Sequence, residues 1–334
     1  MQGPPHPPRI ERPAKISDLS VTQIGQSLEM RFSAPQETTE GERLTKPLEV
    51  EILRSIVPPA KGLSKLPEPE VWMSLTRNEW LPYAHDKEVS YPAHLTDEEF
   101  RAWRGQTLAL AVRTLTRGFR HRPLDSDPSN FVDVAILDVS EPVSSVTCVT
   151  TEKALEIRMA APATMLSGQP LHGLAGYRIY RSDTGLPGSF ALLGETDASP
   201  YRDSHFEFGH SYYYKVRAVF GELAHGAMSD DSQPAKVTPR DVFPPAPPQG
   251  LKGIYAAGGV ELVWTANTES DLAGYHVYRL GNQSAQRLDK DLLRTPIFRD
   301  ANAEPGKTLT YYVTAVDLAG NESKPSAKVE VETK

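Results

Sequence analysis

Short stretches of alternating apolar and polar residues recur along the chain, and residues typical of turns separate them. In residues 259–265 the apolar side chains Val260, Leu262 and Trp264 occupy every second position. Strict alternation predicts a β-strand with one buried face. Strands spaced roughly eight to twelve residues apart, with turn signals between them, indicate antiparallel β-sandwiches. The pattern therefore predicts an all-β chain.

One long segment occurs twice. GLAGYRIYRSDTG (173–185) precedes YYYKVRAV (212–219), and DLAGYHVYRLGN (271–282) precedes TYYVTAVD (310–317). The copies lie about 97 residues apart, which is too long for a solenoid repeat and typical of tandem sandwich domains. The repeat predicts two similar sandwiches in series in the second half of the chain.

Proline-containing segments divide the 334 residues into three predicted domains. Each proline fixes one backbone dihedral and cannot donate a hydrogen bond, so these segments favour extended, semi-rigid linkers. We predict a Pro-rich tether at residues 1–13 and domains at 14–138, 139–240 and 241–334.

The first domain is longer and less regular than the other two. It carries extra sequence, about 57–106, between two of its predicted strands. Within that insertion, LTDEEFRAWRG predicts a short helix, with Thr96 as its cap and Glu99 completing a capping box. The expected fold class is three tandem immunoglobulin-like sandwiches, the first with an inserted loop and short-helix region.

Three motifs resemble those of bacterial fibronectin type III modules. They are Trp264 on the second strand, GYxxYR on the third strand at 176–181 and 274–279, and YxVxAV on the sixth strand at 214–219 and 311–316. The resemblance implies fibronectin type III sandwiches. It also implies a tyrosine that hydrogen-bonds across the sandwich end, matched by Tyr212. Leu309 stands at that place in the third domain, where we expect no such bond.

The start of the chain resembles that of bacterial lipoproteins built from such modules. It shares their Pro-rich run and a TTEG segment, here within PQETTEGERL (35–44). Those lipoproteins begin with a lipidated Cys-Gly, whereas Met1 and Gln2 precede Gly3 here. The resemblance implies an N-terminal lipid anchor in the native form. The start contains no apolar signal region, which we interpret as a processed N-terminus or a cytoplasmic start.

Composition narrows the classes of partner. A net charge of −7, spread along the chain, argues against nucleic acid. No run of eighteen apolar residues occurs, so we predict no transmembrane segment. Cys148 is the single cysteine, which rules out an intrachain disulfide. We predict that it is a small apolar side chain on the first strand of the second domain.

No motif indicates catalysis, a cofactor or a metal. The nine histidines are scattered, and neither H-x-x-x-H nor C-x-x-C spacing occurs. Asp97, Glu98 and Glu99 are adjacent, but acidic residues are favoured at a helix start by the helix dipole. We therefore predict no enzymatic activity, no cofactor and no metal site.

Two groups of residues in the first domain form a candidate interaction surface. Exposed tryptophans in the insertion could stack on sugars or anchor a protein, whereas buried ones would seal the insertion against the sandwich. The basic run RGFRHR could meet an acidic partner or lipid headgroups, whereas such runs are often solvated turns. The candidate residues are Trp72, Trp80, Trp103, Arg117, Arg120 and Arg122.

These observations predict a non-enzymatic scaffold or adhesion-type protein of the bacterial envelope, periplasmic or at the cell surface. It would bind a protein or envelope partner through the first domain, strand edges or end loops. The alternative is a carbohydrate-binding accessory protein that uses the first-domain tryptophans. An enzyme with its site in the insertion is disfavoured, because sandwiches account for every segment.

Overall fold

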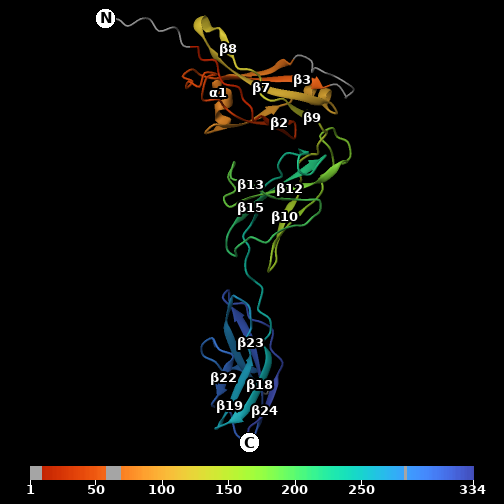
Figure 1. The fold of residues 1–334 in the computed structure, drawn as a ribbon. Helices are drawn as coiled ribbons and strands as arrows, with labels where there is room; N and C mark the ends of the chain where they lie inside the picture. The colour runs from red at the N-terminus through yellow and green to blue at the C-terminus, as the bar shows by residue number, and fades with distance from the viewer. Residues whose placement is uncertain (1–9, 58–68, 282–283) are drawn as a thin grey trace, which may run out of the picture. The chain divides into compact units, whose positions relative to one another are not determined.

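The computed structural model describes residues 10–57, 69–281 and 284–334, which fold into β-sandwiches (Figure 1). The buried apolar side chains of these residues form three separate cores. Most of the predicted tether, residues 1–9, and the Pro-rich stretch 58–68 lie outside the described residues. The chain forms two compact units. One comprises Met1–Phe206 and Ser211–Thr238, and the other comprises Glu207–His210 and Pro239–Lys334.

The third sandwich is the most regular. Its three-stranded sheet has the order β18-β19-β22, and its four-stranded sheet has the order β21-β20-β23-β24. The alternating residues Val260, Leu262 and Trp264 point into its core, as the pattern predicts. The strands are β18 (Gln249–Ala256), β19 (Gly259–Thr265), β20 (Leu272–Leu280), β21 (Ala285–Arg287), β22 (Ile297–Asp300), β23 (Thr308–Asp317) and β24 (Val329–Glu332).

The second sandwich repeats this plan. A three-stranded sheet, β10-β11-β14, faces a sheet built on β13-β12-β15. Cys148 lies on β10 and packs against the core, which confirms the prediction for this residue. The strands are β10 (Val146–Thr150), β11 (Leu155–Met159), β12 (Leu174–Ser182), β13 (Ala191–Thr196), β14 (Tyr201–Asp203), β15 (Tyr212–Phe220), β16 (Ala227–Met228) and β17 (Ala235–Val237).

The first sandwich also has two sheets, with the order β1-β2-β6-β5 in one and β4-β3-β7-β8 in the other, where β9 also pairs with β7. The strands are β1 (Ser20–Ile24), β2 (Ser27–Ser33), β3 (Glu49–Val57), β4 (Glu70–Leu75), β5 (Ala84–His85), β6 (Glu88–His94), β7 (Thr107–Arg117), β8 (Pro123–Asp125) and β9 (Val132–Ala135). The helices are α1 (Arg77–Trp80), η1 (Leu81–Tyr83), α2 (Asp97–Trp103) and η2 (Phe119–His121).

The segment 57–106 is less of an insertion than its sequence predicts, because two of its parts are strands of the sandwich. β4 pairs with β3, and β6 pairs with β2 along its whole length. The helices α1 and α2 lie in the connections that follow these strands. The predicted α2 is confirmed, with Thr96 as its cap and Glu99 completing the capping box. No helix in the described residues is long and apolar enough to cross a membrane.

One nine-stranded sheet joins the first two sandwiches. Ile24 of β1 and Met228 of β16 are parallel partners, and the Gly25 amide donates to the Met228 carbonyl at 2.8 Å. The buried Gln23 side chain donates to the Leu137 carbonyl at 2.8 Å and accepts from the Leu137 amide at 2.8 Å. These bonds explain why the two sandwiches form one unit.

A buried aspartate ties the sheets together in both later sandwiches. In the third, Asp300 of β22 accepts hydrogen bonds from the Tyr311 hydroxyl at 2.9 Å and the Arg279 guanidinium at 2.8 Å. In the second, Asp203 does the same with the Tyr214 hydroxyl and Arg181. The corner bond predicted for Tyr212 stays a prediction.

A pair of serines borders the last strand of each sandwich. In the second sandwich the Ser229 and Ser232 hydroxyls accept hydrogen bonds from the amides of Ala218 and Val216, each at 3.0 Å. The serines thus satisfy backbone N–H donors of β15 in the gap between β16 and β17, where neither of these strands pairs with it. The same Ser-x-x-Ser spacing does this at Ser126 and Ser129 in the first sandwich and at Ser323 and Ser326 in the third.

Candidate functional site

Two of the three candidate tryptophans are buried and do not form a surface. Trp80 is 5% exposed and Trp103 is 6% exposed, and both belong to the first core. The Trp80 indole donates to the Leu48 carbonyl at 3.1 Å. This corrects the predicted interaction surface at these two residues. The physical reason is that α1 and α2 need apolar contacts to hold them against the sandwich.

Trp72 is half-buried and belongs to the same packing. Its ring meets that of Trp103 edge to face, with centroids 5.6 Å apart. Its indole donates to Glu99 at 2.8 Å, and the Arg54 guanidinium lies 4.4 Å from the Trp103 ring centroid. The structure therefore brings Trp72 and Trp103 together as a support for α2.

The three candidate arginines lie at or beside the turn between β7 and β8, on a hairpin that we call the tip hairpin (residues 117–123). Arg117 forms a bidentate pair with Glu49, at 2.9 and 2.6 Å. This pairing raises the pKa of the Arg117 guanidinium. Arg120 is exposed at the turn, and its guanidinium lies 5.4 Å from the ring centroid of Phe119. Phe119 is 78% exposed, and no pattern along the chain marks it as a binding residue.

The tip hairpin is strained. Arg120 and His121 have φ values of 56° and 58°. This is the left-handed region, which costs a residue with a Cβ roughly 1–2 kcal/mol and is normally occupied by glycine or asparagine in such turns. Strain of this kind concentrates at functional sites.

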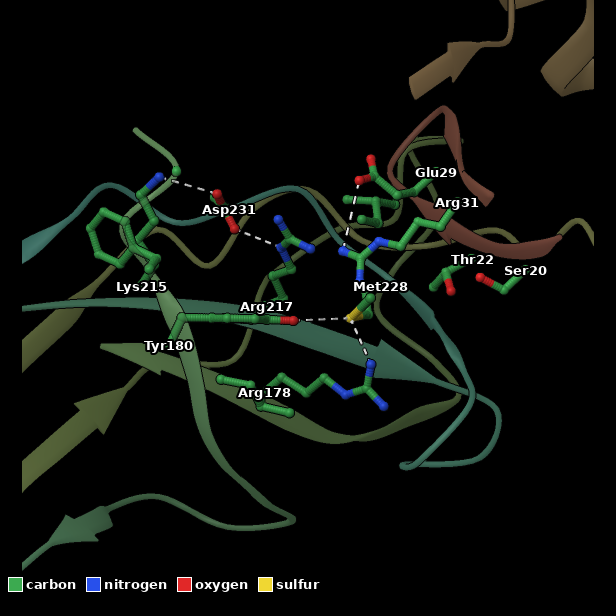
Figure 2. Close-up of a pocket in the computed structure, with 14 residues that line it drawn as sticks. Ser20, Thr22, Glu29, Arg31, Arg178, Tyr180, Lys215, Arg217, Met228 and Asp231 are labelled. Carbon is green, nitrogen blue, oxygen red and sulfur yellow. Dashed lines mark hydrogen bonds and ion pairs between the residues drawn. The ribbon is translucent and has the colours of Figure 1, made fainter. Parts of the chain in front are cut away.

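A cavity of about 520 Å³ lies where the first two sandwiches meet. Figure 2 shows Arg178 reaching toward the Met228 sulfur and Arg31 reaching toward Glu29 among the residues that line it. Arg178 donates to Glu195 at 2.7 Å and to the Met228 sulfur at 3.6 Å. Its other partners are the Leu223 and Ala224 carbonyls. The cavity wall thus combines charged side chains with apolar ones such as Phe190 and Leu192.

Asp231 organises the cations on one side of the cavity. It accepts from Arg217 Nε at 2.6 Å and from Lys215 Nζ at 3.2 Å. Burial alone would raise the pKa of Asp231, but these two ion pairs outweigh it and hold that pKa below its usual range. The Arg217 guanidinium also lies 5.0 Å from the Tyr180 ring centroid. No residue spacing along the chain predicts this site, because its residues come from both sandwiches.

Three carboxylates of the third sandwich could together hold a cation. Oxygens of Asp241, Asp271 and Asp317 all lie within 4.8 Å of one another. The Asn321 amide donates to Asp317 at 2.8 Å and to Asp241 at 3.5 Å, which partly offsets their mutual repulsion.

A histidine–aspartate pair is also present. His276 Nδ1 lies 2.7 Å from Asp289 Oδ2. Such a pair orients a general base in many hydrolases. Here Asp289 also accepts the Val277 amide at 2.7 Å and lies 3.2 Å from Arg287. These contacts give the aspartate a structural role in linking β20 to the segment after β21.

The sheets define the class of protein: tandem immunoglobulin-like sandwiches of the fibronectin type III kind. The second and third sandwiches each pair a three-stranded sheet with a larger one, whereas the first pairs two larger sheets. No protein-family model matches the chain. Exoglucanase B of Cellulomonas fimi is 31% identical over 169 residues, which cover 48% of this chain and 14% of that protein.

Two solved structures of fibronectin type III domains are similar to this chain. One is chicken CNTN1 FN1-FN3 domains, at 12% identity and a TM-score of 0.29, covering 96% of this chain and 99% of that one. The other is a Fn3-like protein from Clostridium thermocellum, at 22% identity and a TM-score of 0.24, covering 27% of this chain and 94% of that one.

Proposed function

We propose that this protein is a non-enzymatic, extracytoplasmic scaffold or adhesion-type protein of the bacterial envelope, which binds a partner through the tip hairpin of its first sandwich. The observation that carries the proposal is the exposed Phe119 on a turn held in a strained conformation, with the Arg120 guanidinium beside its ring. Exposed aromatic and arginine side chains together are typical of binding hot spots. The Pro-rich start supports N-terminal lipid attachment of the native form, by resemblance to lipoproteins.

The partner that fits the tip hairpin carries negative charge next to an apolar surface. Arg120 and Arg122 are both exposed, whereas Arg117 is paired with Glu49. An aromatic ring that loses water on contact contributes most of the binding free energy, and rim charges mainly speed association. An envelope protein with an acidic rim around an apolar pocket meets this description.

The test measures binding of the purified full chain to isolated cell envelopes. We expect Phe119→Ser to weaken binding at least about tenfold, because a hot-spot aromatic contributes about 2 kcal/mol or more. Leu186→Ser is the matched control, since Leu186 is an exposed apolar residue of the second sandwich. Equal binding by wild type and Phe119→Ser would show that the tip hairpin is not the contact.

Arg120→Gly separates binding from folding. Glycine occupies positive φ without a steric cost, so this substitution should stabilise the turn by about 1 kcal/mol. We expect it to weaken envelope binding while the free energy of unfolding rises. A variant that is less stable than wild type would contradict the strain on which the proposal depends.

A carbohydrate-binding accessory role is the second candidate, and the match to Exoglucanase B favours it. That protein is named for action on a glucan, and accessory modules of such enzymes would share its substrate. Binding could not use exposed faces of Trp80 and Trp103, which are buried. Equilibrium binding to insoluble cellulose, xylan and peptidoglycan tests this role, and retention on none of them would remove it.

A further inference from the structure

We propose that the cavity between the first two sandwiches is a binding site for an oxyanion carried by a small acidic sugar, held by Arg31 of the first sandwich and Arg217 of the second. The oxyanion is a carboxylate or a phosphate group. The residues of this site lie apart from the tip hairpin in the sequence. The proposal therefore does not depend on partner binding by the tip hairpin.

Both arginines lie on the outward face of their strands. In β2, Leu28 and Met30 are buried in the core, so Arg31 points the other way. In β15, Val216 is in the core and Arg217 lies on the opposite face. Because β2 and β15 are strands of one joined sheet, their outward side chains line a common cavity.

Both guanidinium groups have unused donors within the described residues. Arg217 donates through Nε to Asp231, and its two terminal nitrogens have no hydrogen-bond partner there. Arg31 has one ionic contact there, to Glu29 at 3.8 Å, which is too long for a hydrogen bond. A guanidinium offers five donors in a planar fork that matches an oxyanion in a bidentate manner.

The net charge of the side chains that line the cavity also favours an anion. Four cations line the cavity against two carboxylates, Glu29 and Asp231. Glu195 neutralises Arg178, and Asp231 is shared between Lys215 and Arg217. One positive charge therefore remains unmatched. The Arg217 side chain is only 20% exposed, so an anion beside it would be less screened than on an open surface.

The size and lining of the cavity favour a sugar as the carrier of the anion. A volume of about 520 Å³ lies within the range of small-molecule sites. The wall includes the polar residues Ser20 and Thr22 and the ring of Tyr180. Hydroxyl groups complement sugar hydroxyls, and an aromatic ring offers an apolar face to the carbons of a sugar.

Isothermal titration of the full chain tests the site with glucuronate, glucose 6-phosphate, inorganic phosphate and neutral glucose. We expect both acidic sugars to bind at least tenfold more tightly than glucose, and less tightly as salt increases. The ratio of the affinities for glucuronate and glucose 6-phosphate shows whether the site prefers a carboxylate or a phosphate group. Inorganic phosphate binding as tightly as the sugars would overturn the sugar as carrier. Absence of binding by all charged probes at millimolar concentration would overturn the site itself.

Arg31→Gln and Arg217→Gln should each weaken binding of the acidic sugar about tenfold or more. Arg158→Gln is the matched control, because Arg158 is an exposed arginine of the second sandwich paired with Glu156. Arg217→Gln could disturb the fold through Asp231. Arg31 is 59% exposed, so Arg31→Gln should leave the protein folded. A loss of affinity in this variant then reports on the site and not on the fold. Wild-type affinity in Arg31→Gln would refute the assignment of this arginine.

Discussion

Single buried polar residues hold the two sheets of each later sandwich together. Asp300 is 4% exposed and satisfies a tyrosine hydroxyl, a guanidinium and the Asn302 amide, the last at 3.0 Å. The neighbouring charge and burial raise the pKa of Tyr311, with burial the larger effect. The hydroxyl therefore stays protonated and donates to the aspartate under all ordinary conditions.

Replacing this aspartate should cost more than replacing the tyrosine that it binds. Asp300→Ala leaves a half-buried guanidinium and a buried hydroxyl without their acceptor, so we expect a loss of about 3–5 kcal/mol. Tyr311→Phe removes one hydrogen bond to a charged group, worth about 1.5–3 kcal/mol. Urea unfolding, with hydrogen exchange read from peptides of the third sandwich, measures both. The reverse order of the two losses would contradict the role given to Asp300.

Cys148 should react slowly in the folded protein. Burial raises the pKa of its thiol from 9.0 to about 11. Only the thiolate reacts, so its fraction near neutral pH falls about a hundredfold. We expect iodoacetamide to modify Cys148 at least that much more slowly in the native than in the urea-unfolded chain. Because the folded pKa is raised, this group favours folding below pH 9.0, and that contribution is lost as pH rises toward 11. Equal rates in the two states would refute burial.

At the scale of elements, α2 depends on its first turn. Glu99 accepts from the Thr96 amide at 2.9 Å and from the Trp72 indole at 2.8 Å. Burial would raise the pKa of Glu99, but these hydrogen bonds outweigh it and lower that pKa below the ordinary 4.5. The carboxylate therefore contributes stability above pH 4.5, and this contribution is lost as pH falls below it.

Glu99→Ala should destabilise the first sandwich by about 1–2 kcal/mol, because it removes half of the capping box and leaves the Trp72 indole unpaired. Glu98→Ala is the matched control, since Glu98 is an exposed residue in the same helical turn. Urea unfolding at pH 7 and pH 4 measures both. A loss for Glu99→Ala that does not shrink at the lower pH would contradict the role of its charge.

The serine pairs also stabilise individual strands, because their hydroxyls accept hydrogen bonds from strand amides. In Ser232→Ala the Val216 amide loses its acceptor in a buried position, which should cost about 1–3 kcal/mol. We expect exchange of that amide with solvent to become faster while amides on β12 keep their protection. Ser204→Ala, at an exposed serine of the same sandwich, is the control. Unchanged protection of Val216 would mean that the hydroxyl is not its acceptor.

Strands can be predicted from the sequence where one face of the strand is buried. They cannot be predicted where prolines and short helices interrupt the alternation. The strands β19, β20 and β23 were evident from alternation alone. Alternation does not predict β6, because Pro92 and the short neighbouring helices interrupt the pattern, although Val89 and Ala93, four residues apart on one face of the strand, are fully buried. The Ser-x-x-Ser pairs were present in the sequence three times, but their use as acceptors depends on the strand they face.

At the scale of the whole molecule, close approach of the backbone joins the first two sandwiches. Gly25 has a φ of +56°, which a residue with a Cβ rarely adopts, and a Cβ there would also crowd the Asp230 carboxylate. Gly25→Val should therefore shift the backbone at this position, weaken the bond from the Gly25 amide to Met228 and loosen the junction. Hydrogen exchange should show loss of protection at residues 23–25 and 227–229, with both cores still protected.

Gly41→Val is the matched control, because Gly41 also has a positive φ but a Cβ there would meet nothing within 4 Å. It should cost stability locally without affecting the junction. If Gly25→Val leaves the amides of the junction protected, close packing at this glycine does not hold the two sandwiches together. Loss of the oxyanion site in the same variant would be expected, since that cavity needs both sandwiches.

The sequence by itself determined the number of sandwiches, the strands with a strict apolar alternation and the capped helix, because each of these depends on local periodicity. Only the tertiary structure decided the burial of Trp80 and Trp103, the ties at Asp203 and Asp300, and the cavity shared by two sandwiches. Those features bring together residues far apart in the chain, and a pattern read along the sequence holds no information about distances across a sheet or between two cores.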